Sequence, residues 1–225
     1  MGAQDPTNRR RWGPGHTRRA AGSLVALLLA LTFSVTGCLP DANNDGRRVW
    51  LMVGDSNTHF TGCSYPLQLQ AQLDPAATLI VDAGVFGSAA WGWIRDDTLA
   101  PLLAADPKPD GVVFALGTND IASTHDSPEA VVDALLTLRA QASAAGVEAF
   151  IATVPPVYGD SPEREHVNQQ INAANALLAR ELPANRLIDF HSGMEPDDFE
   201  ADGVHIKPSG QEKRAAAADR ALSGQ

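Results

Sequence analysis

A serine, an aspartate and a histidine occur in short segments that could together perform acyl transfer. Residues 54–57 read Gly-Asp-Ser-Asn, and residues 202–205 read Asp-Gly-Val-His. On a tight turn before a helix, Ser56 would have backbone amides nearby that stabilise negative charge. Asp202 can hold one imidazole nitrogen of His205 protonated, which leaves the other nitrogen as a base toward the serine. Each segment alone is weak evidence for catalysis. A serine in a turn is usually a helix cap, and Asp/His pairs at this spacing are common by chance.

Two further segments contribute glycines and an asparagine. Residues 84–87 read Gly-Val-Phe-Gly, and residues 117–120 read Gly-Thr-Asn-Asp. Glycines let a backbone approach a ligand closely, and the side-chain amide of Asn119 can donate a hydrogen bond toward a developing oxyanion. The alternative for both segments is a plain turn, for which the same residue types are preferred.

The elements that must position these segments are short apolar strands that alternate with helices. Apolar runs bounded by turn residues predict five strands, at residues 49–53, 79–81, 111–116, 147–154 and 186–190. Helices are predicted at residues 67–73, 128–145, 163–182 and 208–222. This alternation implies a five-stranded parallel sheet covered on both faces, a three-layer α/β/α sandwich. Ligands of such sheets bind at the carboxyl ends of strands, where three of the four segments fall, and the Asp/His segment directly precedes the last helix.

The order of the four segments along the chain resembles the SGNH hydrolase superfamily, also called GDSL-type esterases and lipases. That family has a G-D-S-x block, a glycine block, a G-x-N-D block and a D-x-x-H block, and the resemblance extends over residues 48–222. It implies a flavodoxin-like α/β fold and an enzyme that hydrolyses carboxylic esters through an acyl-enzyme. The partner would be a small-molecule or glycan ester, such as an O-acetyl carbohydrate, a short acyl ester, a lysophospholipid or a thioester.

The resemblance also implies a role for individual residues. Ser56 would attack the ester carbonyl, His205 would take the serine proton and pass it to the leaving alcohol, and Asp202 would orient the histidine. The backbone amides of Ser56 and Gly87, with the side chain of Asn119, would form the oxyanion hole. Spacing from the preceding strand favours Gly87 over the first glycine of that segment. The scheme implies no metal or organic cofactor.

Composition and charge restrict the class of partner. The chain has 225 residues, 44% of them hydrophobic and 20% charged, which is typical of one globular domain. The formal net charge is −10, and because five arginines lie before residue 20, the remainder is more acidic still. Phosphate backbones repel such a domain, so nucleic acid is not an expected partner. The sequence has no Cys-x-x-Cys motif or Cys/His cluster, so a structural zinc site is not expected. We expect a monomer.

Residues 1–37 have the features of an export signal. A basic stretch precedes an apolar run that is shorter than the roughly 20 residues a membrane-spanning helix needs. Residues 36–38 (Thr-Gly-Cys) then resemble the bacterial lipobox, in which the cysteine is lipidated. Residues 38–47 would be a tether and residues 48–225 the hydrolase domain, exported to the cell envelope and anchored to the membrane through lipid on Cys38. The alternatives are an ordinary signal peptide with an incidental cysteine, or a single transmembrane anchor.

Several other side chains could line the cleft or serve the fold. The candidates for lining are His59, His125, Trp91, Trp93 and Tyr158, with a surface or packing role as the alternative for each. Asp55 and Asp120 are predicted to have structural roles, either binding nearby backbone or holding the nucleophile loop.

Two other functions were weighed against ester hydrolysis. A metallophosphoesterase is disfavoured because its early D-x-H, G-N-H-D-type and late G-H-x-H blocks are missing from the sequence. The competing hypothesis from another class is a non-catalytic envelope lipoprotein that uses the same fold to bind glycan or lipid. Binding alone would not require a nucleophile, a base and an orienting carboxylate together.

Overall fold

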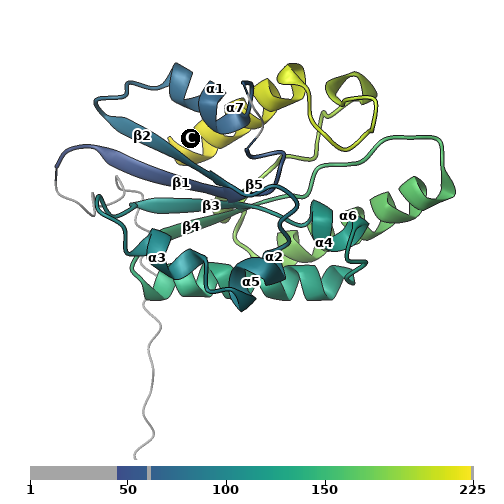
Figure 1. Ribbon diagram of the computed structural model, residues 1–225, viewed down its shortest axis with the longest axis horizontal. Helices are drawn as coiled ribbons and strands as arrows, with labels where there is room; N and C mark the ends of the chain where they lie inside the picture. The colour runs from purple at the N-terminus through teal and green to yellow at the C-terminus, as the bar shows by residue number, and fades with distance from the viewer. Residues whose placement is uncertain (1–44, 60–61, 224–225) are drawn as a thin grey trace, which may run out of the picture. The chain divides into compact units, whose positions relative to one another are not determined.

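The fold is built on one sheet of five parallel strands, seen in a computed structural model that describes residues 45–59 and 62–223 (Figure 1). The strand order is β2-β1-β3-β4-β5. The chain passes from β1 to β2 on one side and then crosses to β3 on the other, so the topological switch point lies between β1 and β3. The strands are β1 (Arg48–Gly54), β2 (Thr78–Gly84), β3 (Gly111–Ala115), β4 (Glu148–Ala152) and β5 (Leu187–Ile188).

Helices cover both faces of this sheet. Their bounds are α1 (Tyr65–Gln72), α2 (Ala90–Arg95), α3 (Leu99–Leu103), α4 (Thr118–Ala122), α5 (Pro128–Ala144), α6 (Pro162–Glu181) and α7 (Pro208–Leu222), with two short 3-10 helices, η1 (Ala184–Arg186) and η2 (Pro196–Asp198). Figure 1 shows α1 and α7 on one face and the helices from α2 to α6 on the other. The predicted three-layer α/β/α sandwich with a five-stranded parallel sheet is confirmed.

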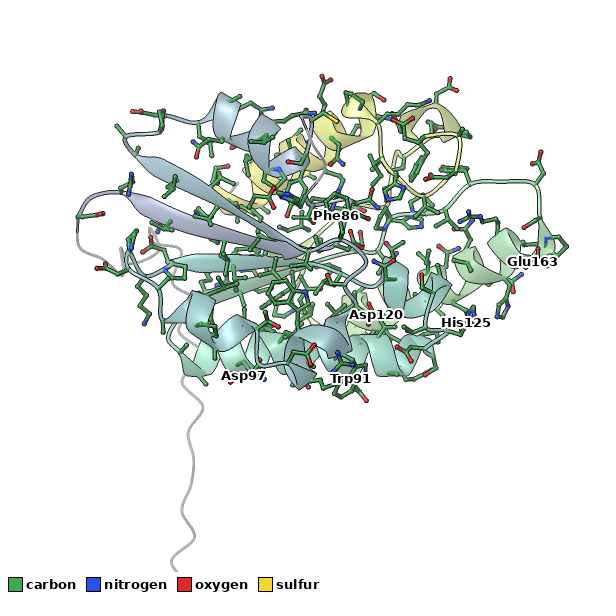
Figure 2. The ribbon with its side chains drawn as sticks, in the orientation of Figure 1. Phe86, Trp91, Asp97, Asp120, His125 and Glu163 are labelled. Atoms are coloured by element: carbon green, nitrogen blue, oxygen red, sulfur yellow. The ribbon has the colours of Figure 1, made fainter. Side chains whose placement is uncertain are left out.

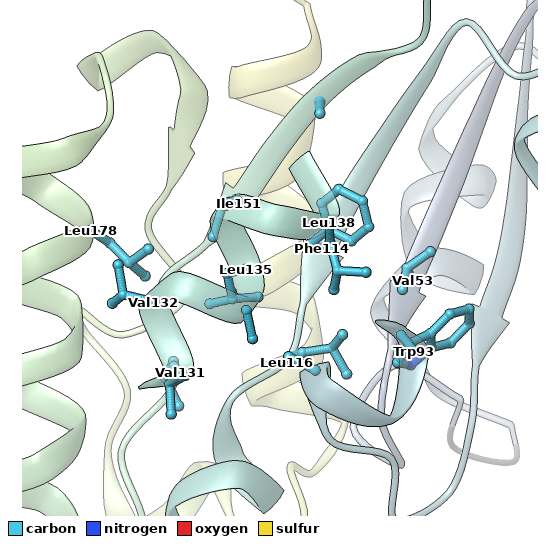
Figure 3. Close-up of a cluster of buried hydrophobic side chains, with 14 of the residues drawn as sticks. Val53, Trp93, Phe114, Leu116, Val131, Val132, Leu135, Leu138, Ile151 and Leu178 are labelled. Carbon is cyan, nitrogen blue, oxygen red and sulfur yellow. The ribbon is translucent and has the colours of Figure 1, made fainter. Parts of the chain in front are cut away.

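Strand β1 illustrates why both faces are covered. Trp50 and Met52 pack in the core beneath α1 and α7, whereas Leu51 and Val53 pack in the opposite core. All four side chains are buried, because successive residues of a strand point to opposite faces and here both faces are covered. Figure 3 shows the opposite core, where Val53 and Trp93 belong to the same cluster of buried side chains.

Strands β4 and β5 are shorter than predicted because side chains take over their backbone hydrogen bonds. Beyond β4, the backbone N–H and C=O of Val154 bind the side-chain amide of Asn175 at 2.8 and 2.9 Å. Beyond β5, the backbone N–H of Phe190 donates to the Thr153 hydroxyl at 2.8 Å, and the Asp189 carboxylate accepts the next two backbone N–H groups, which begins a turn. The helices α2, α3 and α4 are missing from the prediction because five or six residues show too little periodicity.

The N-terminal predictions concern residues that the structure does not describe. The predicted signal peptide, Cys38 and most of the tether lie outside the described residues, so those assignments stay predictions. Within residues 45–59 and 62–223, no helix is both long enough and apolar enough to cross a membrane.

Candidate active site

Two segments far apart in the chain meet near the carboxyl end of β1. They are the nucleophile turn, residues 54–59, and the base loop, residues 199–207. The Nε2 atom of His205 lies 3.1 Å from the Oγ atom of Ser56, and its Nδ1 atom lies 2.6 Å from Oδ2 of Asp202. The serine is only 8% exposed, whereas the histidine and aspartate are partly exposed. The three side chains thus form a hydrogen-bonded chain in which the carboxylate selects the imidazole tautomer.

Asp202 is held in its ionised form by its neighbours. Its Oδ1 atom accepts the backbone N–H groups of Val204 and His205 at 2.8 and 2.9 Å, while Oδ2 faces the imidazole. Partial burial acts to raise the pKa of Asp202, but these hydrogen bonds outweigh burial and lower the pKa to about 2. At neutral pH the carboxylate is therefore charged and can stabilise an imidazolium on His205.

The base loop packs directly on the backbone that follows β4. Gly203 has a left-handed φ of 68°, and a Cβ at this position would collide with the backbone carbonyl of Tyr158. The N–H of Tyr158 donates to the carbonyl oxygen of Gly203 at 2.8 Å. The Tyr158 hydroxyl donates to the carbonyl oxygen of Met194 at 2.6 Å, and its ring lies against Phe199. Tyr158, a candidate for the cleft rim, therefore supports the base loop.

The two glycines of the second segment have different surroundings. Gly84, at the end of β2, lies against the nucleophile turn, where a Cβ would come within 2.6 Å of the backbone nitrogen of His59. Gly87 has a left-handed φ of 70°, and apart from its chain neighbours no described atom lies within 4 Å of where a Cβ would be. Close packing accounts for Gly84, whereas the backbone at Gly87 is open to an incoming ligand.

Asn119 lies in the first turn of α4, directly after β3. Its Nδ2 atom donates to the carbonyl oxygen of Ser88 at 3.0 Å. An amide nitrogen carries two hydrogens, so one remains for a developing oxyanion. The Ser88 hydroxyl donates to the carbonyl oxygen of Gly54 at 3.0 Å and accepts from the indole nitrogen of Trp93 at 3.2 Å. Ser88 therefore joins β1, the glycine segment and α4, a role that the sequence does not indicate.

Asp55 and Asp120 bind nearby backbone, as predicted. Asp55 accepts the N–H of Asn57 at 2.9 Å, and both oxygens of Asp120 accept the N–H of Ala90, at 2.8 and 3.1 Å. Burial raises the pKa of Asp55 to about 6, even though the hydrogen bond from Asn57 and the charge of Arg214 act to lower it. Burial also raises the pKa of Asp120. Both carboxyl groups are buried, so they shape the site and do not face the solvent.

His59 forms a second Asp–His pair at the edge of the site. Its Nδ1 atom lies 3.0 Å from Oδ2 of Asp82, and its ring meets that of Phe86 edge-on. Phe86, labelled in Figure 2, is 58% exposed and directly precedes the open backbone of Gly87. These contacts place an exposed aromatic ring beside the predicted oxyanion hole, and the sequence reasoning did not single out Phe86.

The two tryptophans differ in position. Trp93 is buried in the core of the α2–α6 face, so it packs inside the fold and is not a wall of the cleft. Trp91 is 44% exposed on α2, and His125 is exposed in the segment after α4 with a positive φ of 59° (Figure 2). In the part of the chain that is described, no group of three or more His, Cys, Asp or Glu side chains could hold a metal ion.

The strand order and the Ser-His-Asp hydrogen-bonded chain near the carboxyl end of β1 agree with the fold and the motif order on which the sequence resemblance rests. The model of the GDSL-like Lipase/Acylhydrolase family matches residues 52–213, and the chain belongs to this family. A search of curated proteins found no match to the sequence.

Solved structures share the fold at low sequence identity. Axe2, an acetylxylan esterase from Geobacillus stearothermophilus, superposes with a TM-score of 0.60 at 18% identity, covering 78% of this chain and 94% of that one. A carbohydrate esterase family 3 protein from Talaromyces cellulolyticus gives 0.61 at 21% identity, covering 78% and 96%. TesA gives 0.60 at 23% identity, covering 78% and 98%. At these identities the likeness establishes the fold alone.

Proposed function

We propose that this protein hydrolyses carboxylic esters through an acyl-enzyme formed on Ser56. The observation that carries the proposal is the hydrogen-bonded chain from the Ser56 Oγ atom through His205 to Asp202, with steps of 3.1 and 2.6 Å. A serine hydroxyl is a weak nucleophile unless a base can accept its proton as it attacks. In this proposal His205 is that base, and Asp202 is the charged carboxylate behind it.

The first half of the reaction forms the acyl-enzyme. The Ser56 Oγ atom attacks the ester carbonyl while its proton moves to Nε2 of His205, and the carbonyl oxygen becomes an oxyanion. The imidazolium is stabilised by Asp202, which stays ionised because its pKa is about 2. When the tetrahedral intermediate collapses, the C–O bond to the alcohol breaks and His205 gives its proton to the leaving oxygen.

The oxyanion is stabilised by donors on three separate elements. They are the backbone N–H of Ser56 after β1, the backbone N–H of Gly87 in the open segment after β2, and the remaining amide hydrogen of Asn119 at the start of α4. Preorganised donors of this kind supply several kcal/mol to acyl transfer, roughly 3 kcal/mol for one side-chain amide. In the second half of the reaction, His205 takes a proton from water as the water oxygen attacks the acyl-enzyme. The bond between the acyl carbon and the Ser56 Oγ atom then breaks, His205 returns the proton to that Oγ atom, and the free acid leaves.

The substrates we propose are O-acetyl groups on carbohydrate and other short acyl esters, with lysophospholipids and thioesters as further candidates. Two proteins of the same fold are described as an acetylxylan esterase and a carbohydrate esterase, which makes acetylated glycans the first substrates to test. The exposed ring of Phe86 beside Gly87 is a surface on which a sugar or an acyl chain could pack.

The test is hydrolysis of p-nitrophenyl esters of increasing chain length and of acetylated xylan and chitin oligomers by the full chain. Replacing the nucleophile, Ser56→Ala, should lower turnover by roughly 10⁴-fold or more. Equal activity of wild type and Ser56→Ala would refute the assignment. If a correctly folded wild type bound glycan without hydrolysing any ester, the binding-module hypothesis would replace it.

We also propose that the protein is exported and anchored to the membrane of the cell envelope through lipid on Cys38. The support is the lipobox-like sequence directly after the apolar run. A Cys38→Ser variant should appear in the soluble fraction, while wild type sediments with membranes. A variant that still sediments with membranes would contradict the lipid anchor.

A further inference from the structure

Asn57 follows the candidate nucleophile, and its carboxamide spans the residues on either side of the candidate base. The Nδ2 atom of Asn57 donates to the carbonyl oxygen of Val204 at 3.1 Å, and its Oδ1 atom accepts the backbone N–H of Ile206 at 2.9 Å. Val204 and Ile206 are the neighbours of His205 in the chain. One side chain of the nucleophile turn therefore holds the base loop at two points, one before and one after the imidazole.

The main chain of Asn57 is itself fixed from two sides. Its N–H donates to Asp55, and its carbonyl oxygen accepts from Nε2 of Gln211 at 3.0 Å and from Nη1 of Arg214 at 2.6 Å. Gln211 and Arg214 both belong to α7, the helix that begins where the base loop ends. Asn57 is 2% exposed, so its contacts are made in the protein interior.

Arg214 is a rigid support for this arrangement. Its guanidinium lies over the rings of Tyr65 and Phe190, with centroid distances of 4.5 and 4.6 Å, and these two rings contact each other edge-on. A planar guanidinium packed on two aromatic rings in the core loses much of its freedom to move. The backbone carbonyl of Asn57 therefore accepts a hydrogen bond from a guanidinium that is packed in the core. Because this backbone is held in place, the side-chain carboxamide of Asn57 is also held in its orientation.

Other hydrogen bonds act within the base loop or tie it to the backbone that follows β4. The N–H of Tyr158 binds the carbonyl of Gly203, and the N–H of Glu200 donates to the carbonyl oxygen of His205 at 2.7 Å. These bonds shape the loop, but they do not set its distance from the nucleophile turn. The two bonds from the Asn57 side chain join the loop directly to that turn.

We infer that Asn57 is a positioning residue, whose carboxamide bridge sets the distance and alignment between the Ser56 hydroxyl and the His205 imidazole. The inference rests on the proposed esterase function and adds a residue to it. Proton transfer within a hydrogen bond depends steeply on alignment, and a misplacement of about 1 Å can lower a rate by on the order of 10²-fold. Loss of the bridge therefore acts on turnover, because both polar atoms of the Asn57 side chain bind the base loop.

The experiment compares Asn57→Ala with a matched control, Asn175→Ala. The control removes the same kind of two-bond bridge, from the Asn175 carboxamide to the backbone of Val154. Both variants lose two hydrogen bonds from a side-chain amide to the backbone, so we expect a fall in melting temperature for each. Asn57→Ala should lower kcat on p-nitrophenyl acetate by on the order of 10²-fold, with KM changed by less than about threefold. Asn175→Ala should keep a kcat close to that of wild type.

Labelling with a fluorophosphonate provides a second measurement that does not depend on the ester. The Oγ–P bond of Ser56 forms as the P–F bond breaks, fluoride leaves, and the serine proton passes to His205. Because this step needs the same base, Asn57→Ala should slow labelling by about the same factor as hydrolysis. Should Asn57→Ala fold poorly, Asn57→Asp retains an acceptor for Ile206 but sets a carboxylate oxygen against the carbonyl oxygen of Val204 in place of the donor, so its rates should also fall below those of wild type.

The measurements distinguish a failure of the inference about Asn57 from a failure of the proposed esterase function. A wild-type kcat in folded Asn57→Ala or Asn57→Asp would overturn the inference while the proposed function stands. An equal loss of kcat in Asn57→Ala and Asn175→Ala would also overturn it, since the effect would then be general destabilisation. If wild type neither hydrolysed esters nor reacted with the fluorophosphonate, the proposed function would fail and the inference with it.

Discussion

Asp55 should lower the stability of the folded protein at neutral pH, and Asp55→Asn should remove that effect. The carboxyl group is 2% exposed, and burial raises its pKa from the ordinary value of 3.8 to about 6. Between these pH values the folded protein keeps a proton on Asp55 that the unfolded chain has lost. Stability rises with pH only where the unfolded state binds more protons, so here the free energy of unfolding falls as the pH rises.

The magnitude follows from the size of the shift. Roughly two pH units at 1.36 kcal/mol each correspond to about 3 kcal/mol. An asparagine side chain has the shape of the neutral carboxyl group and can still accept the N–H of Asn57. The stability of Asp55→Asn relative to wild type should therefore increase by up to about 3 kcal/mol between about pH 3.5 and about pH 7. A difference between the contacts of asparagine and those of the protonated carboxyl group would offset the whole difference curve, but it would not create this slope.

Urea unfolding followed by circular dichroism, at half-unit steps of pH, measures this difference. The matched control is Asp198→Asn. Burial acts to raise the pKa of Asp198, but hydrogen bonds from Lys213 and the backbone of Glu195 outweigh burial and lower it. The Asp198 carboxylate therefore stabilises the fold above its unfolded pKa, and this contribution is lost as the pH falls, the opposite sign to Asp55. Parallel stability curves for wild type and Asp55→Asn from pH 3.5 to 7 would refute the reasoning on Asp55.

Three other substitutions test the site. Asn119→Ala removes the side-chain oxyanion donor, so kcat on p-nitrophenyl acetate should fall by on the order of 10²-fold, and an unchanged rate would remove Asn119 from the oxyanion hole. Asp202→Asn should keep the fold, checked by circular dichroism, but lower kcat by on the order of 10³-fold or more, because the imidazole of His205 loses the carboxylate that selects its tautomer. Gly203→Ala should lower the free energy of unfolding, measured in urea titrations, by roughly 1–3 kcal/mol. The added Cβ would collide with the carbonyl of Tyr158, and the backbone at this position has a left-handed φ. An unchanged free energy of unfolding would contradict the tight packing of the base loop.

The sequence by itself determined the architecture and the candidate chemical groups. The apolar run of β1 is buried on both faces as predicted, and α5 begins at Pro128 after a Ser127 cap and ends before Gly146. These features are local, because period, capping and turn preference depend on residues within a few positions of each other. The motifs around Ser56 and His205 are equally local, and only their order along the chain indicated a common site.

Tertiary structure alone decided how those groups meet and what surrounds them. Ser56 and His205 are 149 positions apart, and their approach to 3.1 Å depends on how α7 and the base loop pack against the nucleophile turn. The bridge from Asn57, the support from Arg214 and the raised pKa of Asp55 all involve partners distant in sequence. The burial and the contact geometry of these groups arise from packing between segments that are distant in sequence. They cannot be predicted from any short stretch of the sequence for that reason.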